Sequence, residues 1–399
     1  MDIRKDFPIL KTNLIYFDNG ATTLKPQSVI DAITEYYSHY SANAHRGDYS
    51  ISQKVDTVYE TTRNKVRQFI NARETGEIIF TKGSTESLNM IVFGFFKYYL
   101  KKGDEILLTK SEHSSNILPW FELGKDIGCV VKYIPLDNKG KVTLNNVKKM
   151  INEKTKVISL AHITNVVGDI RPLKEITELA HQHNILVVSD ASQSIGHMKV
   201  DVTDLDIDFM AFSGHKMCGP TGIGVLYGKY EYLDKMRPME FGGGMNASFD
   251  VDGTVEYKSL PHRLEAGTPN IAGVVGLGAA IDYLNRIGID NITRIERELR
   301  KYALEKLSKI DNVIVYNTHT DSGIIAFNLK GVFSQDTALY LDQHNICVRA
   351  GNHCAKMLKD EFNTKNTCRI SFYFYNTEEE IDKLVEVLQD GKDIFKVIL

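Results

Sequence analysis

Between residues 75 and 228, short apolar runs alternate with amphipathic stretches, and this alternation restricts the possible folds more than any other feature. Several runs are continuous Val, Ile and Leu, as in strands buried on both faces of a mostly parallel sheet. Helical patterns, for instance at 86–101 and 172–183, lie between them. The predicted strands are 105–109, 130–135, 156–161, 185–190, 208–212 and 223–227. The pattern predicts a doubly wound α/β domain whose ligand lies outside the carboxyl ends of the strands.

A different pattern follows residue 270 and indicates a smaller α+β domain. A terminal helix is expected at 378–388, because Thr377 before it is a good N-cap. The other predicted elements are helices at 271–287 and 291–309 and strands at 313–316, 323–329 and 369–375. The chain has 399 residues, more than one hydrophobic core usually organises. We expect a large domain at 16–284 and a small domain formed by 1–15 and 285–399.

The charge balance excludes several classes of partner. Lys and Arg total 48 and Asp and Glu total 51, so the formal net charge is -3. This provides no basic field for nucleic acid and no polybasic membrane anchor. No apolar run reaches the length of a membrane span, and residues 1–6 lack the apolar core of a signal peptide. We therefore expect a cytoplasmic protein that binds a small molecule or another protein.

The five cysteines indicate neither a disulfide framework nor a structural zinc site. Their number is odd, they are scattered, and no pair has CxxC spacing. We expect free thiols and no metal, and each thiol is by default a small buried hydrophobe. The cysteines are Cys129, Cys218, Cys347, Cys354 and Cys368.

A lysine at the end of a predicted strand is the strongest chemical signal. Lys216 ends the run Phe212-Ser213-Gly214-His215-Lys216, and a glycine-rich turn follows. An amine at the mouth of a sheet, beside a hydroxyl and an imidazole, suits a Schiff base next to a phosphate. Taken alone, the run also fits an exposed lysine at a strand-to-turn junction.

A carboxylate ends the strand before it. Asp190 ends the predicted strand at 185–190, which is apolar up to Val188. A carboxylate there can keep a pyridinium nitrogen protonated, so that the ring withdraws electrons from the Cα atom of a bound amino acid. Gln193 can hydrogen-bond the phenolic oxygen of such a ring. Asp190 alone would also fit a helix N-cap, but together with Lys216 it favours the cofactor.

Two further elements point to the same sheet edge. At Gly83 the chain turns from a strand into a helix, and the N–H groups there form an anion site with the hydroxyls of Ser84 and Thr85. His113 follows the strand at 105–109, where it can stack on a cofactor ring and shuttle protons. The turn alone would fit an ordinary N-cap, and a lone histidine is usually structural.

Together these elements resemble the fold-type I pyridoxal-phosphate (PLP) enzymes, specifically the class V aminotransferase-like group that contains the cysteine desulfurases. The similarity covers nearly the whole chain, from the run at 16–23 (YFDNGATT) to that at 375–377 (YNT). The run at 349–355 (RAGNHCA) is similar to the RxGxHCA signature of the SUF-type (group II) cysteine desulfurases. The resemblance implies a mixed, mostly parallel sheet in a large PLP-binding domain. It also implies a small α+β domain with the persulfide cysteine and the carboxylate-binding arginine.

The resemblance implies a role for each candidate residue. Lys216 carries the cofactor as a Schiff base, Asp190 pairs with the pyridine nitrogen, and Arg369 receives the substrate α-carboxylate through a bidentate pair. Arg369 alone would fit a surface arginine at a strand start. The implied catalytic residues are Lys216, Cys354 and His113. The other cofactor-binding residues are Ser84, Thr85, Asn165, Gln193, Ser213, His215 and, from the second subunit of a homodimer, Thr268. Asn165 and Arg349 accompany Arg369 at the substrate.

The reaction type depends on Cys354. By resemblance, L-cysteine becomes L-alanine while its sulfur passes to Cys354 as a persulfide and then to a SUF-type acceptor protein for iron-sulfur cluster assembly. A free cysteine has a pKa of roughly 8.5, so a nucleophilic one needs cationic help, which Arg349 and His353 are close enough in sequence to give. A spectator thiol is the alternative. A selenocysteine lyase, another class V lyase or aminotransferase, and a catalytically retired scaffold also fit, and the sequence does not rank cysteine against selenocysteine.

The chain departs from the family pattern at several positions. Ser114 stands where a second histidine often follows His113, and Asn352-His353 replaces the paired histidines of some members. None of these departures removes a group with a stated chemical role. Cys218, close to Lys216, receives no function.

Overall fold

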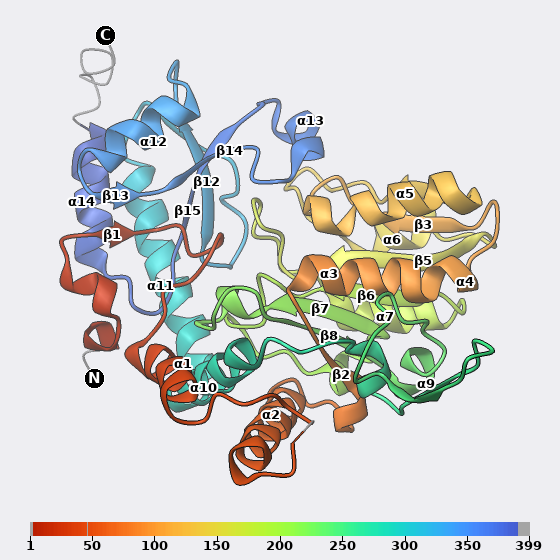
Figure 1. The fold of residues 1–399 in the computed structure, drawn as a ribbon. Helices are drawn as coiled ribbons and strands as arrows, with labels where there is room; N and C mark the ends of the chain where they lie inside the picture. The colour runs from red at the N-terminus through yellow and green to blue at the C-terminus, as the bar shows by residue number, and fades with distance from the viewer. Residues whose placement is uncertain (1–2, 46, 390–399) are drawn as a thin grey trace.

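The computed structural model describes residues 3–45 and 47–389, so residues 1–2 and 390–399 of the predicted small domain lie outside the described part. A layered body built on a seven-stranded sheet lies beside a smaller four-stranded sheet (Figure 1). The predicted boundaries of the two domains stay a prediction. Among the described helices, none is long and apolar enough to cross a membrane.

The large sheet confirms the predicted α/β pattern. Its strand order is β2-β8-β7-β6-β5-β3-β4, and the neighbours from β7 to β4 are all parallel. Only β8 is reversed, because it is antiparallel to both β2 and β7. The strands are β2 Ile78–Thr81, β3 Glu105–Leu108, β4 Val130–Tyr133, β5 Thr155–Ala161, β6 Leu186–Asp190, β7 Phe209–Ser213 and β8 Gly224–Gly228. The carboxyl ends of β2, β3, β5, β6 and β7 therefore meet at one edge.

Apolar side chains cover both faces of this sheet, as the continuous Val, Ile and Leu runs predict. In β6, for example, Val187 belongs to one apolar cluster and Val188 to the other. The first face is covered by α1 Gln27–His39, α2 Ser50–Phe69, α6 Leu144–Met150, α7 Leu173–His181, α8 Val202–Leu205 and α10 Ile271–Ile287. The second is covered by α3 Ser84–Asn89, the π-helix η4 Met90–Phe96, α5 Leu118–Ile127 and α9 Tyr230–Leu233. The short helix α4 Lys97–Tyr99 continues η4. The helix predicted at 86–101 is thus confirmed, with a π-helical middle.

The smaller sheet has the order β11-β12-β15-β14 and is antiparallel throughout. Its strands are β11 Val313–Val315, β12 Ile324–Leu329, β14 Arg349–Gly351 and β15 Thr367–Ser371. It shares an apolar cluster with α11 Ile289–Leu307, α12 Ser334–Asp342 and α14 Glu378–Gln389. A short parallel pair, β1 Ile15–Tyr16 with β13 Ile346–Cys347, ties the N-terminal segment to this part. Across β14 and β15, Arg349 lies opposite Arg369.

The strand predicted at 369–375 is wrong over its second half, because β15 ends at Ser371. The residues after it turn away and bury three aromatic rings in the apolar cluster of the large sheet. Tyr375, for instance, packs against Phe7 with ring centroids 4.5 Å apart. This contact anchors the segment after β15 in the apolar cluster of the large sheet.

Candidate active site

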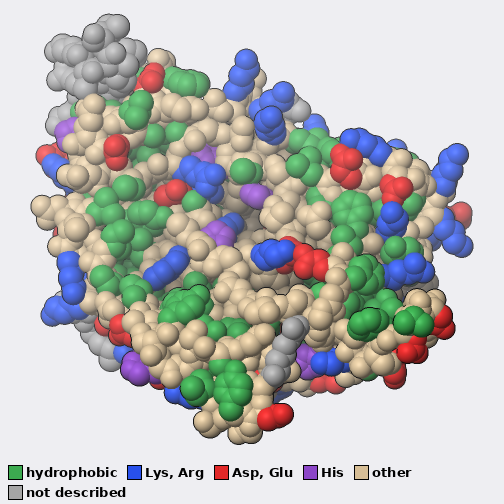
Figure 2. All heavy atoms as spheres, viewed as in Figure 1, with side chains coloured by type: hydrophobic (Ala, Val, Ile, Leu, Met, Phe, Trp, Pro, Cys, Tyr) green, Lys and Arg blue, Asp and Glu red, His purple; other side chains and the backbone are tan. Residues whose placement is uncertain are grey.

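Five strands of the large sheet deliver predicted residues to one cavity at their carboxyl ends. The cavity is lined by Ser84, His113, Asn165, Asp190, Gln193 and Lys216, together with Ala161, Ile163 and Ser192. Figure 2 shows Lys, Arg and His side chains gathered around the hollowed middle of this face. The structure thus brings together six of the residues that the sequence singled out.

Asp190 occupies the floor of the cavity at the end of β6, where it is 5% exposed. Its Oδ1 atom accepts hydrogen bonds from the Ser192 backbone N–H at 3.0 Å and from the Ser192 hydroxyl at 2.5 Å. No helix begins there, so the alternative interpretation as a helix N-cap does not apply. Ser192 holds the carboxylate in a fixed orientation, and sequence reasoning had missed it.

Lys216 lies on a single 3-10 turn, η6 Gly214–Lys216, directly after β7. Desolvation lowers the pKa of its amine from 10.5 to about 8, with Arg369 and Arg349 adding to the effect and Asp190 and Cys354 opposing it. Part of the side chain stays open to the cavity. A neutral amine is the nucleophilic form, so burial prepares Lys216 for attack on a carbonyl.

The lowered pKa predicts how the amine reacts as pH changes. In the cofactor-free enzyme, labelling of Lys216 by an amine-reactive reagent should rise with pH to a midpoint near 8 instead of 10.5, because the neutral form dominates above the pKa. Peptide mass spectrometry would measure the label, with exposed Lys199 as the internal reference. Arg349→Gln should move the midpoint to higher pH, since Arg349 lowers this pKa. A wild-type midpoint near 10.5 would contradict the assignment.

Hydroxyl groups gather where β2 turns into α3. The Ser213 hydroxyl accepts from the Ser84 N–H at 2.8 Å and donates to the Ser84 hydroxyl at 3.0 Å. The Thr85 hydroxyl contacts that of Ser115 at 2.8 Å. The turn needs glycine, because Gly83 has a φ of 154°. The result is a cluster of hydroxyls and N–H groups that suits a phosphate.

His113 lines the cavity and contacts one member of this cluster. Its Nδ1 atom is 3.1 Å from the Ser115 hydroxyl. Burial lowers the pKa of the imidazole, Asp190 opposes the effect, and Lys216 adds to it. His113 is therefore neutral near pH 7. His215 lies outside the lining of the cavity, and burial lowers its pKa to about 4.

A second group of polar residues surrounds Arg369 on β15, which is 1% exposed. Its guanidinium donates to the Asn165 carbonyl at 2.9 Å and to Asp18 Oδ1 at 3.0 Å, while its Nε atom has no partner. A Cβ atom on Gly20 would lie 3.1 Å from the guanidinium carbon. Gln193, in turn, donates to the Gly20 carbonyl at 2.8 Å. Arg369 is thus not a surface arginine, and Asp18 is a partner that the sequence did not indicate.

Cys354 lies on a loop after β14, half-buried, and it contributes to the pKa of Lys216. Its carbonyl accepts hydrogen bonds from the Ser114 N–H at 2.8 Å and the Ser114 hydroxyl at 2.7 Å. The expected cationic help from His353 is wrong. Burial, with Arg369 adding to it, lowers the pKa of His353 to about 3, so the imidazole is neutral near pH 7. Its Nε2 atom instead lies 2.9 Å from the Thr367 carbonyl.

The structure does not bring Thr268 to this cavity. Thr268 is exposed and lines a different pocket, together with Lys82 and Glu86. Within a single chain, Thr268 and Lys216 therefore line different pockets.

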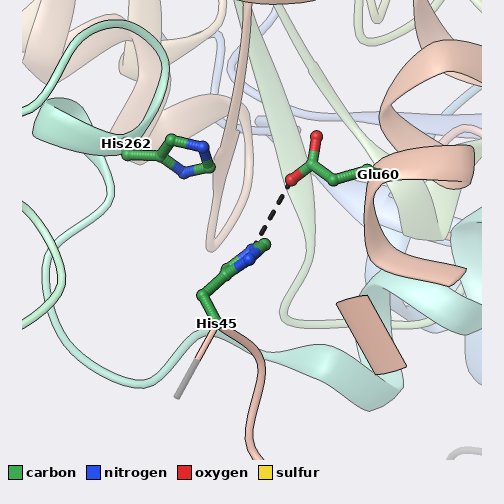
Figure 3. Close-up of side chains that lie close together, drawn as sticks. All are labelled: His45, Glu60 and His262. Atoms are coloured by element: carbon green, nitrogen blue, oxygen red, sulfur yellow. Dashed lines mark ion pairs between the residues drawn. The ribbon is translucent and has the colours of Figure 1, made fainter. Parts of the chain in front are cut away.

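Three side chains with metal-binding atoms lie close together elsewhere, as Figure 3 shows for His45, Glu60 and His262. His45 Nε2 is 3.5 Å from Glu60 Oε1. The Glu60 carboxylate is also bound by the buried Arg63, whose Nε atom is 3.0 Å from Oε2. A cationic guanidinium at this distance opposes a metal ion, so we interpret Glu60 as the partner of Arg63 and not as a metal ligand.

A buried ion pair supports the turn that carries His113. Glu112 and Arg171 are joined by an ion pair, and both side chains are 0% exposed. The other Glu112 oxygen accepts from the Ala161 N–H at 2.7 Å and from Asn116 at 2.9 Å. Glu112 thus ties the segment after β3 to the end of β5.

Removing this carboxylate should destabilise the fold strongly. Glu112→Ala leaves the buried Arg171 with only the more distant carboxylate of Asp169, 3.7 Å from its Nε atom. Removing one partner of a buried ion pair costs about 3–5 kcal/mol. The measurement is the urea midpoint of unfolding. Glu122→Ala is the control, because Glu122 pairs with Lys125 on the surface and such pairs contribute about 0–1 kcal/mol. Equal midpoints for the two variants would contradict the assignment.

The cavity fits PLP on several observations. Asp190 is a buried carboxylate, Lys216 is an amine of lowered pKa, and the hydroxyls near Gly83 form an anion site. The Asn165 Oδ1 atom is buried and without a partner. These are the groups that a pyridine nitrogen, an aldehyde, a phosphate and a hydroxyl of the cofactor require.

Comparison with known proteins decides the family. The family model described as "Aminotransferase class-V" matches residues 15–384. A probable cysteine desulfurase of Halalkalibacterium halodurans is 45% identical over 99% of this chain and 98% of its own length. The chain belongs to the cysteine desulfurases of the aminotransferase class-V family.

Solved structures of the family agree with this assignment. The apo cysteine desulfurase from Thermococcus onnurineus NA1 has a TM-score of 0.94 and 40% identity, over 98% of this chain and 97% of its own. The Escherichia coli cysteine desulfurase CsdA, in an S-sulfonic acid form, has a TM-score of 0.92 and 36% identity, over 98% of each chain. The sequence-based predictions of a fold-type I PLP enzyme and of PLP as its cofactor are confirmed.

Proposed function

We propose that this class-V enzyme takes the sulfur of L-cysteine onto Cys354 and releases L-alanine. The observation that carries the proposal is the contact between the Cys354 loop and the turn that bears His113. The Cys354 carbonyl is bonded to Ser114, and Cys354 lies near enough to Lys216 to affect the pKa of its amine. These two observations support a role for the Cys354 thiol together with the Lys216 amine.

The chain's own residues divide the work at the cofactor. Lys216 would hold PLP covalently, Asp190 would face its ring nitrogen, and Ser84, Thr85 and Ser213 would bind its phosphate. His113, Asn165 and Gln193 line the same space and would contact the ring and its hydroxyl. When bound, PLP withdraws electrons from the Cα atom of the amino acid.

Arg369 would orient the substrate through its α-carboxylate. The guanidinium is buried, fixed by Asp18, and retains an unpaired Nε–H. A carboxylate that enters gains charge-assisted hydrogen bonds in a site with little water. Arg349, opposite Arg369 across the small sheet, adds a second positive charge.

Lys216 and Cys354 then act in sequence. The neutral Lys216 amine takes the proton from Cα. The Cys354 thiolate attacks the substrate sulfur, and a sulfur–sulfur bond forms as the Cβ–sulfur bond breaks. The electron pair of the broken bond stays with the carbon fragment, which takes up protons and leaves as L-alanine. His113 would move one of these protons.

We further propose a cytoplasmic homodimer that passes the persulfide sulfur to a SUF-type acceptor protein for iron-sulfur cluster assembly. Exposed apolar residues on the hairpin of β9 Asn246–Phe249 and β10 Val255–Tyr257, such as Phe249 at 72% exposure, support a dimer. So does the position of Thr268 outside the cavity of its own chain. Sedimentation at the mass of one 45.1 kDa chain would contradict the dimer.

The products distinguish the proposed reaction from a lyase. With excess L-cysteine and no reductant, the enzyme should release about one alanine per active chain and then stall, because the persulfide occupies Cys354. Adding a thiol reductant should restore turnover. A simple β-eliminating lyase would release pyruvate and hydrogen sulfide continuously, and that result would contradict the proposal.

A further inference from the structure

The loop that carries Cys354 holds an unusual backbone conformation. His353 has a φ of 51° and Cys354 a φ of 59°, so two consecutive side-chain-bearing residues occupy the left-handed region. Such conformations persist when surrounding contacts determine them, and they gather at functional sites. The contacts that hold this loop therefore decide where the thiol lies.

Most contacts of the loop hold the residues on either side of Cys354. The His353 carbonyl accepts from the Asn165 side chain at 2.6 Å, and the His353 ring contacts Thr367. Ala355 belongs to a small apolar cluster with Val166. These contacts anchor the flanking residues. None of them binds the carbonyl of Cys354, which accepts its hydrogen bonds from another residue.

Ser114 provides that group, and it does so twice. Its N–H and its hydroxyl both donate to the Cys354 carbonyl, at 2.8 Å and 2.7 Å. Ser114 also begins the 3-10 turn η5 Ser114–Asn116, whose N-cap is His113. One turn therefore holds both the imidazole in the cofactor cavity and the backbone of the sulfur-accepting residue.

We infer that Ser114 is a positioning residue that fixes Cys354 in reach of the substrate sulfur through its hydroxyl. The inference rests on the proposed function. Ser114 is not itself one of the residues that line the cavity, so we assign its effect to its contact with Cys354. The hydroxyl contributes one of the two bonds.

The test is Ser114→Ala, which removes the hydroxyl bond and keeps the backbone bond. We expect kcat for alanine formation from L-cysteine to fall roughly 10-fold, because a small misplacement of a reacting group has effects of that order or larger. KM should stay within about twofold, since Arg369 and the cofactor residues are unchanged. Ser114→Thr retains a hydroxyl and should recover most of the lost kcat.

Alkylation of the thiol gives a readout that overall stability does not move. In Ser114→Ala, Cys354 should be alkylated several-fold faster relative to Cys347, which is also half-buried. Thr203→Val is the matched control. The Thr203 hydroxyl also donates to a backbone carbonyl, that of Asn71 at 2.7 Å, but this bond lies away from the site. That control should alter neither kcat nor the alkylation ratio.

The outcomes separate this inference from the proposed function. If wild-type enzyme forms a persulfide on Cys354 but Ser114→Ala retains its kcat and alkylation ratio, the positioning role is wrong and the proposed function stands. If wild-type enzyme forms no persulfide there, the proposed function fails first. If Ser114→Ala does not fold, the kcat of Ser114→Thr tests the inference instead. A tenfold loss of kcat in this variant, which keeps a hydroxyl, would overturn the inference.

Discussion

Replacing Lys216 with alanine is expected to abolish turnover of L-cysteine. The variant loses the amine that would bind the cofactor covalently and the base that would take the Cα proton. Loss of proton transfer alone typically costs about 10²–10⁴-fold in rate, and loss of covalent attachment adds to it. Alanine release by the variant, measured with saturating PLP, should lie at least about 10³-fold below wild type.

Borohydride reduction provides an independent readout for this variant. In the wild type it should fix the cofactor to the peptide that contains Lys216, while Lys216→Ala should lose the cofactor on dialysis. Lys199→Ala, on an exposed lysine, is the control and should behave as wild type. Cofactor fixed by borohydride in Lys216→Ala would overturn the assignment of the Schiff-base lysine.

Replacing Cys354 with alanine is expected to stop sulfur transfer without stopping the step before it. Alanine formation should fall roughly 10³-fold or more, as when a catalytic nucleophile is removed. Exchange of the Cα proton of L-cysteine with deuterium from solvent should continue, because Lys216 and Arg369 remain. Nuclear magnetic resonance of the recovered substrate measures this exchange.

Cys347→Ala is the matched control for this variant. Cys347 is a second half-buried thiol, on β13 Ile346–Cys347, and its removal should leave alanine formation within about twofold of wild type. Wild-type alanine formation by Cys354→Ala would refute the persulfide mechanism and favour another class V reaction.

The residues at strand ends were predictable because parallel strands align their carboxyl ends. Asp190 and Lys216 each follow a continuous apolar strand, and β6 and β7 pair in parallel, so the two groups had to meet at one edge. The turn at Gly83 lies at the same edge as Asp190 and Lys216. This is because β2 runs in the same direction as β6 and β7, and only β8 is reversed. Local sequence thus contained enough information for the cofactor end of the site.

The contacts that complete the site join residues far apart in the chain, and sequence spacing does not reveal such pairs. Ser114 meets Cys354 across 240 residues, and Arg369 meets Asp18 across 351. His353 was wrongly expected to be a cation because its burial against Thr367 depends on tertiary packing. The prediction of a strand was wrong over the second half of 369–375 for a similar reason. The aromatic rings of that segment are buried against the large sheet.

The most direct test of the account is the mass of the Cys354 peptide after the enzyme reacts with L-cysteine. Holoenzyme should be treated with L-cysteine, without reductant, blocked with an alkylating reagent and digested. The persulfide mechanism predicts one additional sulfur atom on the peptide that contains Cys354, formed in step with alanine and absent from Lys216→Ala. Alanine released while the Cys354 peptide carries no additional sulfur would contradict it.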